Sequence, residues 1–216
     1  MKLPIDKDPS YASFAARYAD DVVAFAEEVL GLDLTPSQAE ILRSAAVPGT
    51  RIGLTTHGES QDYLLPQVAL HRLFFRPRAV TSVACPSEVL PEGDPYRRLV
   101  LTASTGPLGW VRPYLKLTGS SIRIVHSAGQ SSVEFVPMRT GGPEEAVRPG
   151  PDHMWFIPDA GKIPARAFQY IAAGLTDRSQ GVVCASPANP EFGNDTPIRL
   201  PLQEWFFCWP PREDVA

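Results

Sequence analysis

The sequence predicts an α/β domain with a mostly parallel sheet covered by helices on both faces. Short apolar runs have the length of buried strands, and segments with helical spacing lie between them. The runs are RIGLT (51–55), AVTSVACP (79–86), HMWFIPDA (153–160) and GVVCASPANP (181–190). Buried strands that alternate with helices favour a three-layer arrangement. With 216 residues, of which 44% are hydrophobic, the chain is long enough for one such domain.

Helices are predicted where apolar residues recur at helical spacing. Residues 20–31 (DDVVAFAEEVLG) form one helix that ends at Gly31. Residues 34–46 form another, with Thr35 as the N-cap residue and Gln38 completing a capping box. A helix after the first strand should end near Phe75. The segment PARAFQYIAAGL (164–175) also reads as helical.

The remaining segments give weaker signals. SIRIVHS (121–127) and SSVEFVPM (131–138) alternate apolar and polar residues around AGQ, which predicts a small β-hairpin insertion. Residues 86–120 are broken by proline and glycine, and no element is predicted there. We divide the chain into N-terminal helices (1–50), an α/β core (51–200) and a C-terminal segment with a tail (201–216).

Composition narrows the setting of the protein. The net charge is −4, so the protein as a whole does not attract phosphate groups electrostatically. No run of 18 apolar residues occurs and the N-terminus has no apolar leader, so we expect neither a membrane span nor secretion. Cys85 and Cys184 lie in strand-like runs, which favours buried thiols in a reducing cytoplasm.

A strand followed by Gly, Ser and a helix has the outline of a phosphate-binding loop. The stretch LTTHGESQDYLL (54–65) has this form but lacks the lysine that such loops use. In parallel sheets, functional residues gather at the carboxyl ends of the strands. We therefore expect 56–62 (THGESQD), 158–162 (PDAGK) and 186–195 (SPANPEFGND) to share one crevice.

Taken in order, these segments resemble the ATPase domain of the large terminase subunit, the DNA-packaging motor of tailed phages. The resemblance covers about residues 11–200 and rests on the segments 18–42, 57–74, 80–90, 121–138, 148–176 and 182–193. It implies a P-loop NTPase fold of the RecA/ASCE kind. It assigns a nucleotide-binding-like set of Gln38, Thr55, His57, Gly58, Ser60, Gln61 and Asp62, and coupling-like residues Ser186 and Asn189.

The departures from the family motif decide the predicted function. The positions that correspond to the two glycines, the lysine and the hydroxyl of G-x-x-x-x-G-K-[ST] hold Thr55, Ser60, Gln61 and Asp62. Gln61 carries no charge, and Asp62 places a carboxylate where a phosphate would arrive. At about 4 Å and an effective dielectric of about 20, two like charges repel by about 4 kcal/mol. Pro66 further predicts that the helix begins late, near residues 63–65.

The acidic strand end departs from the family pattern as well. Where the family has Asp-Glu-Ala, this chain has Pro158, Asp159 and Ala160, so Asp159 is the candidate catalytic residue. A one-residue slip of this correspondence would make Asp159 the magnesium ligand and place Ala160 at the position of the base, so either register loses one role. We therefore predict a pseudo-ATPase with no cofactor, or ATP and magnesium if the deviant site works. The family's nuclease domain is not expected in this chain.

The resemblance also implies partners. These are terminase subunits or portal-type packaging proteins, and double-stranded DNA, in a possible oligomer within the host cytoplasm, with no membrane. The arginines Arg72, Arg76, Arg78, Arg97 and Arg98 are the DNA-binding candidates, with a solvated face as the simpler interpretation.

Alternatives remain open at this stage. One is an active ATPase in which Arg51, or an arginine of a neighbouring subunit, replaces the lysine. Another is a serine hydrolase that uses Ser60, although no histidine follows His153 and the last glycine of the G-x-S-x-G motif is absent. Gln38 has an equal structural interpretation as a capping residue, and His126 and His153 read as structural.

Overall fold

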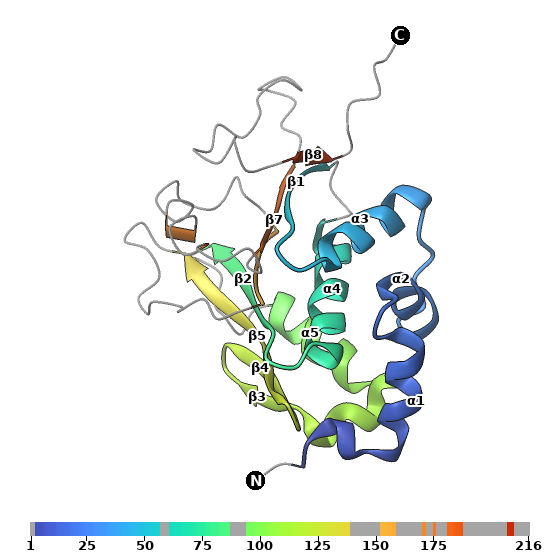
Figure 1. Ribbon diagram of the computed structural model, residues 1–216. Coiled ribbons are helices and arrows are strands. Elements are labelled where there is room, and N and C mark those ends of the chain that lie inside the picture. The colour runs from blue at the N-terminus through green and yellow to red at the C-terminus, as the bar shows by residue number, and fades with distance from the viewer. Residues whose placement is uncertain are drawn as a thin grey trace.

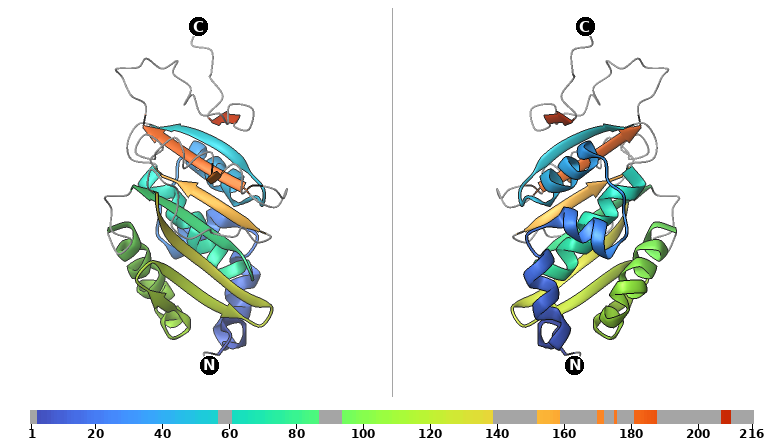
Figure 2. Two further views of the ribbon diagram at one scale, coloured as in Figure 1. Left: turned by 90° about the vertical axis from the view of Figure 1, so that its left-hand side faces the viewer. Right: turned by 90° about the vertical axis from the view of Figure 1, so that its right-hand side faces the viewer.

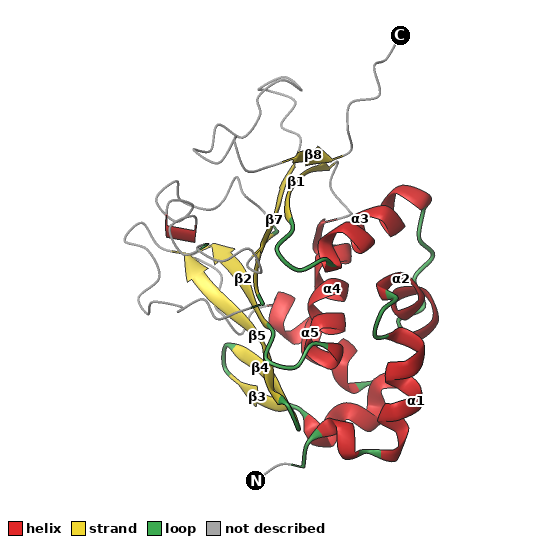
Figure 3. Ribbon diagram, viewed as in Figure 1, coloured by secondary structure: helices red, strands yellow, loops and turns green. Residues whose placement is uncertain are grey.

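The computed structural model describes residues 3–56, 61–86, 94–138, 152–158, 170–171, 175, 181–187 and 207–209. These residues form an eight-stranded sheet with a layer of helices packed on one face (Figure 1). A short helical segment at 170–171 lies on the opposite face (Figure 3). No helix in the described ranges has the length and apolar character needed to cross a bilayer.

The sheet is parallel except at one edge. Its strands are β1 (Arg51–Thr56), β2 (Val80–Pro86), β3 (Lys116–Thr118), β4 (Ser121–His126), β5 (Gly129–Met138), β6 (His153–Ile157), β7 (Gly181–Pro187) and β8 (Phe207–Trp209). Their order is β3-β4-β5-β2-β6-β7-β1-β8, and only the β3–β4 and β4–β5 pairs are antiparallel. The predicted mostly parallel α/β sheet is confirmed.

Apart from residues 170–171, the described helices lie on the same face of the sheet (Figure 2). They are η1 (Ile5–Lys7), α1 (Pro9–Tyr18), α2 (Val22–Ala24), η2 (Phe25–Val29, a π-helical turn), α3 (Pro36–Ala46), α4 (Gln61–Phe75), α5 (Asp94–Ser104) and η3 (Gly106–Tyr114). Of the predicted helix at 164–175, only residues 170, 171 and 175 are described, and 170–171 are helical.

The predicted helix starts are made by local capping. Asp21 accepts hydrogen bonds from the backbone N–H groups of Val23 and Ala24, at 3.1 and 2.9 Å, and so caps α2. At α3 the backbone N–H of Thr35 donates to Gln38 Oε1 at 2.9 Å, and that of Gln38 donates to Thr35 Oγ1 at 3.3 Å. The predicted capping box is confirmed.

The predicted hairpin is present and is part of the central sheet. β4 and β5 pair antiparallel around a turn at Ser127, and β5 continues the sheet by pairing parallel with β2. Its buried residues explain this position, because Ile122, Ile124 and Val133 are all fully buried. The hairpin therefore extends the sheet toward its antiparallel edge.

The region for which no element was predicted contains α5, η3 and β3. Leu99 and Ala103, four residues apart on α5, are buried, whereas Leu101 is 62% exposed. The helix is thus amphipathic with one narrow buried stripe. η3 is a 3-10 helix that contains Pro113 and buries Leu108.

The core centres on α4, which lies between the sheet and the N-terminal helices. Its residues Leu64, Leu65, Val68, Leu70, Leu73 and Phe74 are at most 2% exposed. Phe14, Phe25 and Phe74 form an edge-to-face cluster with centroids 6.0 to 6.3 Å apart. Trp155 and Phe156 of β6 are buried as well.

β7 enters the sheet between β6 and β1 with very little space. A Cβ on its first residue, Gly181, would lie 2.5 Å from the carbonyl oxygen of Thr50 and 2.8 Å from Sδ of Met154. Glycine is therefore the residue that this close approach of the three strands permits.

Candidate functional site

The carboxyl ends of three neighbouring strands form the candidate site. β6, β7 and β1 are adjacent and parallel, so the segments that follow them leave from one edge of the sheet, the carboxyl edge. Thr55 of β1 lies opposite Ser186 of β7, and Thr56 lies opposite Pro187. The backbone thus brings together two predicted site residues, Thr55 and Ser186, that are far apart in the sequence.

Helix α4 begins directly after the predicted phosphate loop. It runs from Gln61 to Phe75 with Pro66 inside it, so the prediction of a late start near residues 63–65 is wrong. Proline at this position forfeits one backbone hydrogen bond, to the carbonyl of Asp62. Burial of Leu64 and Leu65 outweighs that local cost, because both side chains lie in the core. The helix N-terminus therefore stands where a phosphate-binding helix has it.

Gln61 and Asp62, which replace the lysine and the hydroxyl residue of the family motif, are the first two residues of this helix. Gln61 and Asp62 occupy its first turn, within the described backbone, while the described side chains of the helix begin at Leu64. A carboxylate in a first helical turn is favoured by the helix dipole. An anionic ligand would have to compete with it for the same positive end.

The acidic strand exit is described up to Pro158. β6 ends at Ile157, which lies opposite Cys184 of β7, and Pro158 follows as a half-buried residue. Pro158, predicted to stand in the place of the family's magnesium-binding aspartate, thus lies directly at the strand exit, and its correspondence to that aspartate stays a prediction. The candidates His57, Gly58, Ser60, Asp159 and Asn189 lie outside the described residues.

Arg51 lies at the wrong end of its strand to replace the missing lysine. It is the first residue of β1, whereas the loop follows the last, Thr56. At about 3.3 Å per residue these positions are about 16 Å apart. Arg51 therefore cannot supply positive charge to the loop. This corrects the alternative in which Arg51 replaces the lysine of an active ATPase.

The five predicted DNA-binding arginines do not form one surface. Arg72 is 1% exposed, and its Nη2 pairs with Asp152 Oδ1 at 2.9 Å, so it cannot contact DNA and that assignment is wrong. Arg76 and Arg78 follow α4 and precede β2, which places them at the opposite, amino edge of the sheet. Arg97 and Arg98 lie in α5, where Arg98 is exposed and the side chain of Arg97 is outside the described part.

The amino edge contains a buried polar cluster that the sequence did not indicate. Besides its ion pair, Arg72 donates from Nη2 to the carbonyl oxygen of Asp152 at 2.9 Å and from Nε to Thr81 Oγ1 at 3.2 Å. Beside it, Nε2 of His153 lies 2.9 Å from Ser82 Oγ. Burial lowers the pKa of the Arg72 guanidinium from its ordinary value, and the charge of Asp152 opposes that shift.

These contacts argue against the serine hydrolase alternative. His153 is 1% exposed and bonded to Ser82, and its neighbour Asp152 is paired with Arg72, all at the amino edge. Ser60 follows the carboxyl end of β1 in the sequence. An acid and a histidine at the opposite edge cannot serve Ser60, so the geometry argues against a triad built from these residues.

Two further buried groups, His126 and Cys85, have structural roles. Nε2 of His126 lies 3.0 Å from Ser131 Oγ and 3.2 Å from the carbonyl oxygen of Leu73, which confirms its predicted structural role. Burial raises the pKa of the Cys85 thiol to about 11, as expected for an inert buried thiol. Within the described ranges, no three His, Cys, Asp or Glu side chains gather as a metal site would require.

In sequence, the chain is similar to a phage large terminase. No protein-family model matches the chain. It is 26% identical over 188 residues to a probable terminase large subunit of Enterobacteria phage P7, covering 85% of this chain and 38% of that relative. The chain thus spans well under half the length of this relative.

One solved structure shows the same likeness in the fold. The large terminase ATPase domain of Thermus phage P74-26 superposes with a TM-score of 0.53 at 17% identity, over 74% of this chain and 67% of that one. The large terminase of bacteriophage D6E, solved with ADP, gives a TM-score of 0.47 at 9% identity, over 81% and 44% of the two chains. The chain therefore has the P-loop fold of a large-terminase ATPase domain, as its sequence predicted, and is similar in sequence to a phage large terminase.

Proposed function

We propose that this chain is a terminase-like domain of phage DNA packaging that does not hydrolyse ATP competently and acts by binding protein or DNA. The proposal rests on one observation. The first two residues of α4 are Gln61 and Asp62, so the helix start that faces the loop carries a carboxylate and no lysine or hydroxyl.

The position of the helix sharpens this argument. If α4 began late, its anion-binding N-terminus would be displaced from the loop. The helix in fact begins at Gln61, directly after the loop. The proposed loss of ATP hydrolysis therefore comes from the missing lysine and hydroxyl and from the charge of Asp62, and not from a displaced helix. Pro158 supports it independently, because a proline at the exit of β6 has no oxygen in its side chain to hold magnesium.

Calorimetric titration with Mg-ATP tests the proposal. We expect no binding to the natural chain and restored binding in Gln61→Lys with Asp62→Thr, which returns the lysine and the hydroxyl. The matched control is Ala12→Lys with Asp33→Thr, which makes the same charge change at two exposed positions elsewhere. Binding by the control would mean that net charge alone is responsible, and failure of the restored variant would mean that the loop serves another purpose.

The competing function is an active ATPase with a deviant loop, in which an arginine of a neighbouring subunit supplies the charge. It predicts ATP hydrolysis by the purified protein that Asp159→Ala abolishes. Such a result would overturn the pseudo-ATPase proposal. The expected result is a hydrolysis rate indistinguishable from that of the Asp159→Ala variant.

The proposed partners are packaging proteins and DNA. If DNA is bound, the exposed arginines away from the core, such as Arg98, are the remaining candidates. Binding through phosphates weakens steeply as salt increases. A gel-shift series over salt concentration, with Arg98→Gln beside the natural chain, tests this; a flat salt response or the absence of a shift at low salt would leave protein partners alone.

A further inference from the structure

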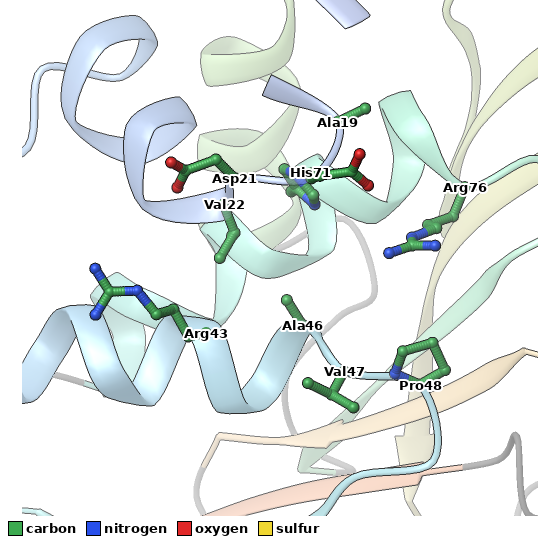
Figure 4. Close-up of a pocket in the computed structure, with 10 residues that line it drawn as sticks. Ala19, Asp21, Val22, Arg43, Ala46, Val47, Pro48, His71 and Arg76 are labelled. Carbon is green, nitrogen blue, oxygen red and sulfur yellow. The ribbon is translucent and has the colours of Figure 1, made fainter. Parts of the chain in front are cut away.

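The helical layer contains a pocket at the amino edge of the sheet, away from the candidate nucleotide site. It lies where the α1–α2 connection, the end of α3 and the second half of α4 meet (Figure 4). Its volume is about 360 Å³. Residues that line it include Asp20, Val22, Val47, Pro48, His71 and Arg76. A space of this size holds two or three amino-acid residues or a small molecule.

His71 offers the pocket a hydrogen-bond acceptor. It is 3% exposed, and its Nε2 lies 2.8 Å from the carbonyl oxygen of Tyr18. A carbonyl accepts only, so Nε2 carries the proton and Nδ1 carries the lone pair. Within the described residues Nδ1 has no hydrogen-bond partner, and the ring lies at the wall of the pocket (Figure 4).

The neutral state of His71 keeps this acceptor available. Burial lowers the pKa of His71 to about 4, with smaller contributions in the same direction from the charges of Arg76 and Arg72 and opposing ones from the Tyr18 hydrogen bond and the Asp20 charge. The ring is therefore neutral at physiological pH. A ligand must present an N–H or O–H to it.

Arg76 supplies a positive charge on the other side of the pocket. Its half-buried side chain points toward the space between His71 and Pro48 (Figure 4). The guanidinium makes no hydrogen bond or ion pair within the part of the chain that the structure describes. Arg43, also on the wall, lies 3.7 Å from Glu40 and points away. Arg76 is thus the arginine placed to meet a carboxylate.

The rim of the pocket is apolar. Val47 is 54% exposed, and Pro48 beside it is exposed as well. Of the charged groups on the walls, Arg43 lies beside Glu40 and Asp21 caps α2. The walls therefore offer a ligand the cation of Arg76, the acceptors of His71 and Asp20, and an apolar rim. A peptide offers the complement of all three, because it has a backbone N–H, an acidic side chain and a neighbouring apolar side chain.

From these contacts we infer that the pocket binds an acidic–apolar peptide segment of a separate protein partner, with its carboxylate on Arg76, a backbone N–H on His71 Nδ1 and its apolar side chain on Val47. DNA fits less well. The phosphate backbone of DNA has no N–H or O–H to donate to the lone pair of Nδ1 and no apolar side chain to place on Val47. This inference rests on the protein-binding role proposed above, but it shares no residue with the nucleotide site.

The test is a titration of the labelled protein by NMR, with the ring signals of His71 and the Nε–H signal of Arg76 as the readout. The probe is acetyl-Glu-Leu-amide at millimolar concentrations, because a dipeptide of this kind should bind with a Kd on the order of 1 mM. Acetyl-Gln-Leu-amide and acetyl-Lys-Leu-amide are the matched probes. A short double-stranded DNA forms the fourth arm.

We expect the acidic peptide to shift both signals and the other two peptides to bind at least about five-fold more weakly. Arg76→Gln should weaken the acidic peptide by a similar factor, and Val47→Ser by roughly two- to three-fold. Arg112→Gln, which changes an exposed arginine of η3 outside the pocket, is the control and should leave binding unchanged.

Several results would overturn the inference. These are equal binding of the three peptides, unchanged binding in Arg76→Gln, or no shift at the highest peptide concentration. A stronger shift by DNA at low salt would assign the pocket to nucleic acid instead. Because Mg-ATP titration involves Gln61 and Asp62 only, failure here and failure of the pseudo-ATPase proposal are separate outcomes.

Discussion

The two edges of the central sheet hold their polar residues in different ways. At the carboxyl edge, the predicted site residues stand at strand ends and in the segments that follow, such as Thr55 and Ser186. At the amino edge, Arg72, Asp152 and His153 form a buried cluster with defined partners. Helix α4 joins the two edges, since its first residues face one and Arg72 faces the other. The buried charges at the amino edge therefore have a structural role. Asp62, whose carboxylate replaces the hydroxyl of the family motif, lies at the carboxyl edge, where the nucleotide site is predicted.

The largest expected effect tests whether the amino-edge cluster holds α4 in place. Asp152→Asn keeps a residue that tolerates the positive φ of 58° at this position but removes the charge opposite Arg72. The guanidinium, 1% exposed, is then buried without a counter-charge, which costs about 3–5 kcal/mol. Urea unfolding measures the loss.

Arg72→Met is the companion variant. It leaves the carboxylate of Asp152, whose side chain is 27% exposed and can be hydrated, so the loss should be smaller than for Asp152→Asn. A larger loss in Arg72→Met would mean that the hydrogen bonds of Arg72, rather than charge burial, stabilise this edge.

Acid should loosen the helical layer and the amino edge before other parts of the fold. Burial lowers the pKa values of His71 and His153 to about 4, from an ordinary value of 6.5. The unfolded chain thus binds more protons than the folded one between these values, so stability is lost as pH decreases from about 6.5 toward 4. Between pH 7 and pH 5 each histidine should account for roughly 2 kcal/mol.

The measurement is the urea midpoint as a function of pH, in the natural chain and in His153→Gln. The variant should show a shallower pH dependence by about the share of one histidine, whatever its stability at neutral pH. Identical pH profiles would show that His153 is not the group that titrates.

At the carboxyl edge, Pro66→Ala should stabilise the start of α4. The new N–H can donate to the carbonyl of Asp62 and complete the helical ladder, which contributes about 1 kcal/mol. Hydrogen exchange should slow at the backbone N–H groups of residues 65–68, which donate to the carbonyls of residues 61–64. If exchange there is unchanged, the helix does not extend to Gln61 in solution.

The smallest effect concerns Gln38. Its side-chain oxygen accepts the hydrogen bond from the backbone N–H of Thr35, so Gln38→Ala removes half of the capping box and should cost about 0.5 kcal/mol. In the Lys- and Thr-restored variant, Mg-ATP affinity should be the same with and without Gln38→Ala. A loss of affinity would assign Gln38 to the nucleotide.

Sequence reasoning succeeded where the signal is local. The capping box at Thr35 and Gln38 depends on residues three apart, and the strands are marked by continuous apolar runs. α5 and η3 were missed because prolines and glycines dominate their surroundings, although Asp94 and Pro95 at the start of α5 are the residue types that begin helices. Leu99 and Ala103, at i and i+4, were the remaining signal.

Non-local partners were out of reach. Arg72 and Asp152 are 80 positions apart, and a basic cluster in the sequence gives no hint that one member is buried. The start of α4 was misjudged for a related reason. The cost of Pro66 is visible in the sequence, but the burial that offsets it depends on the N-terminal helices and the sheet.

The position of β7 has a consequence for how the chain assembles during synthesis. Among the described strands, β1 pairs only with β7 and β8, both of which leave the ribosome long after it. Strands β2 to β6 are already complete by then, so the earliest strand is the last to be enclosed. We expect a nascent chain stalled before Gly181 to leave the β1 segment open to protease, and a chain stalled well beyond β8 to protect it. Protection before Gly181 emerges would show that another segment holds β1 in the interim.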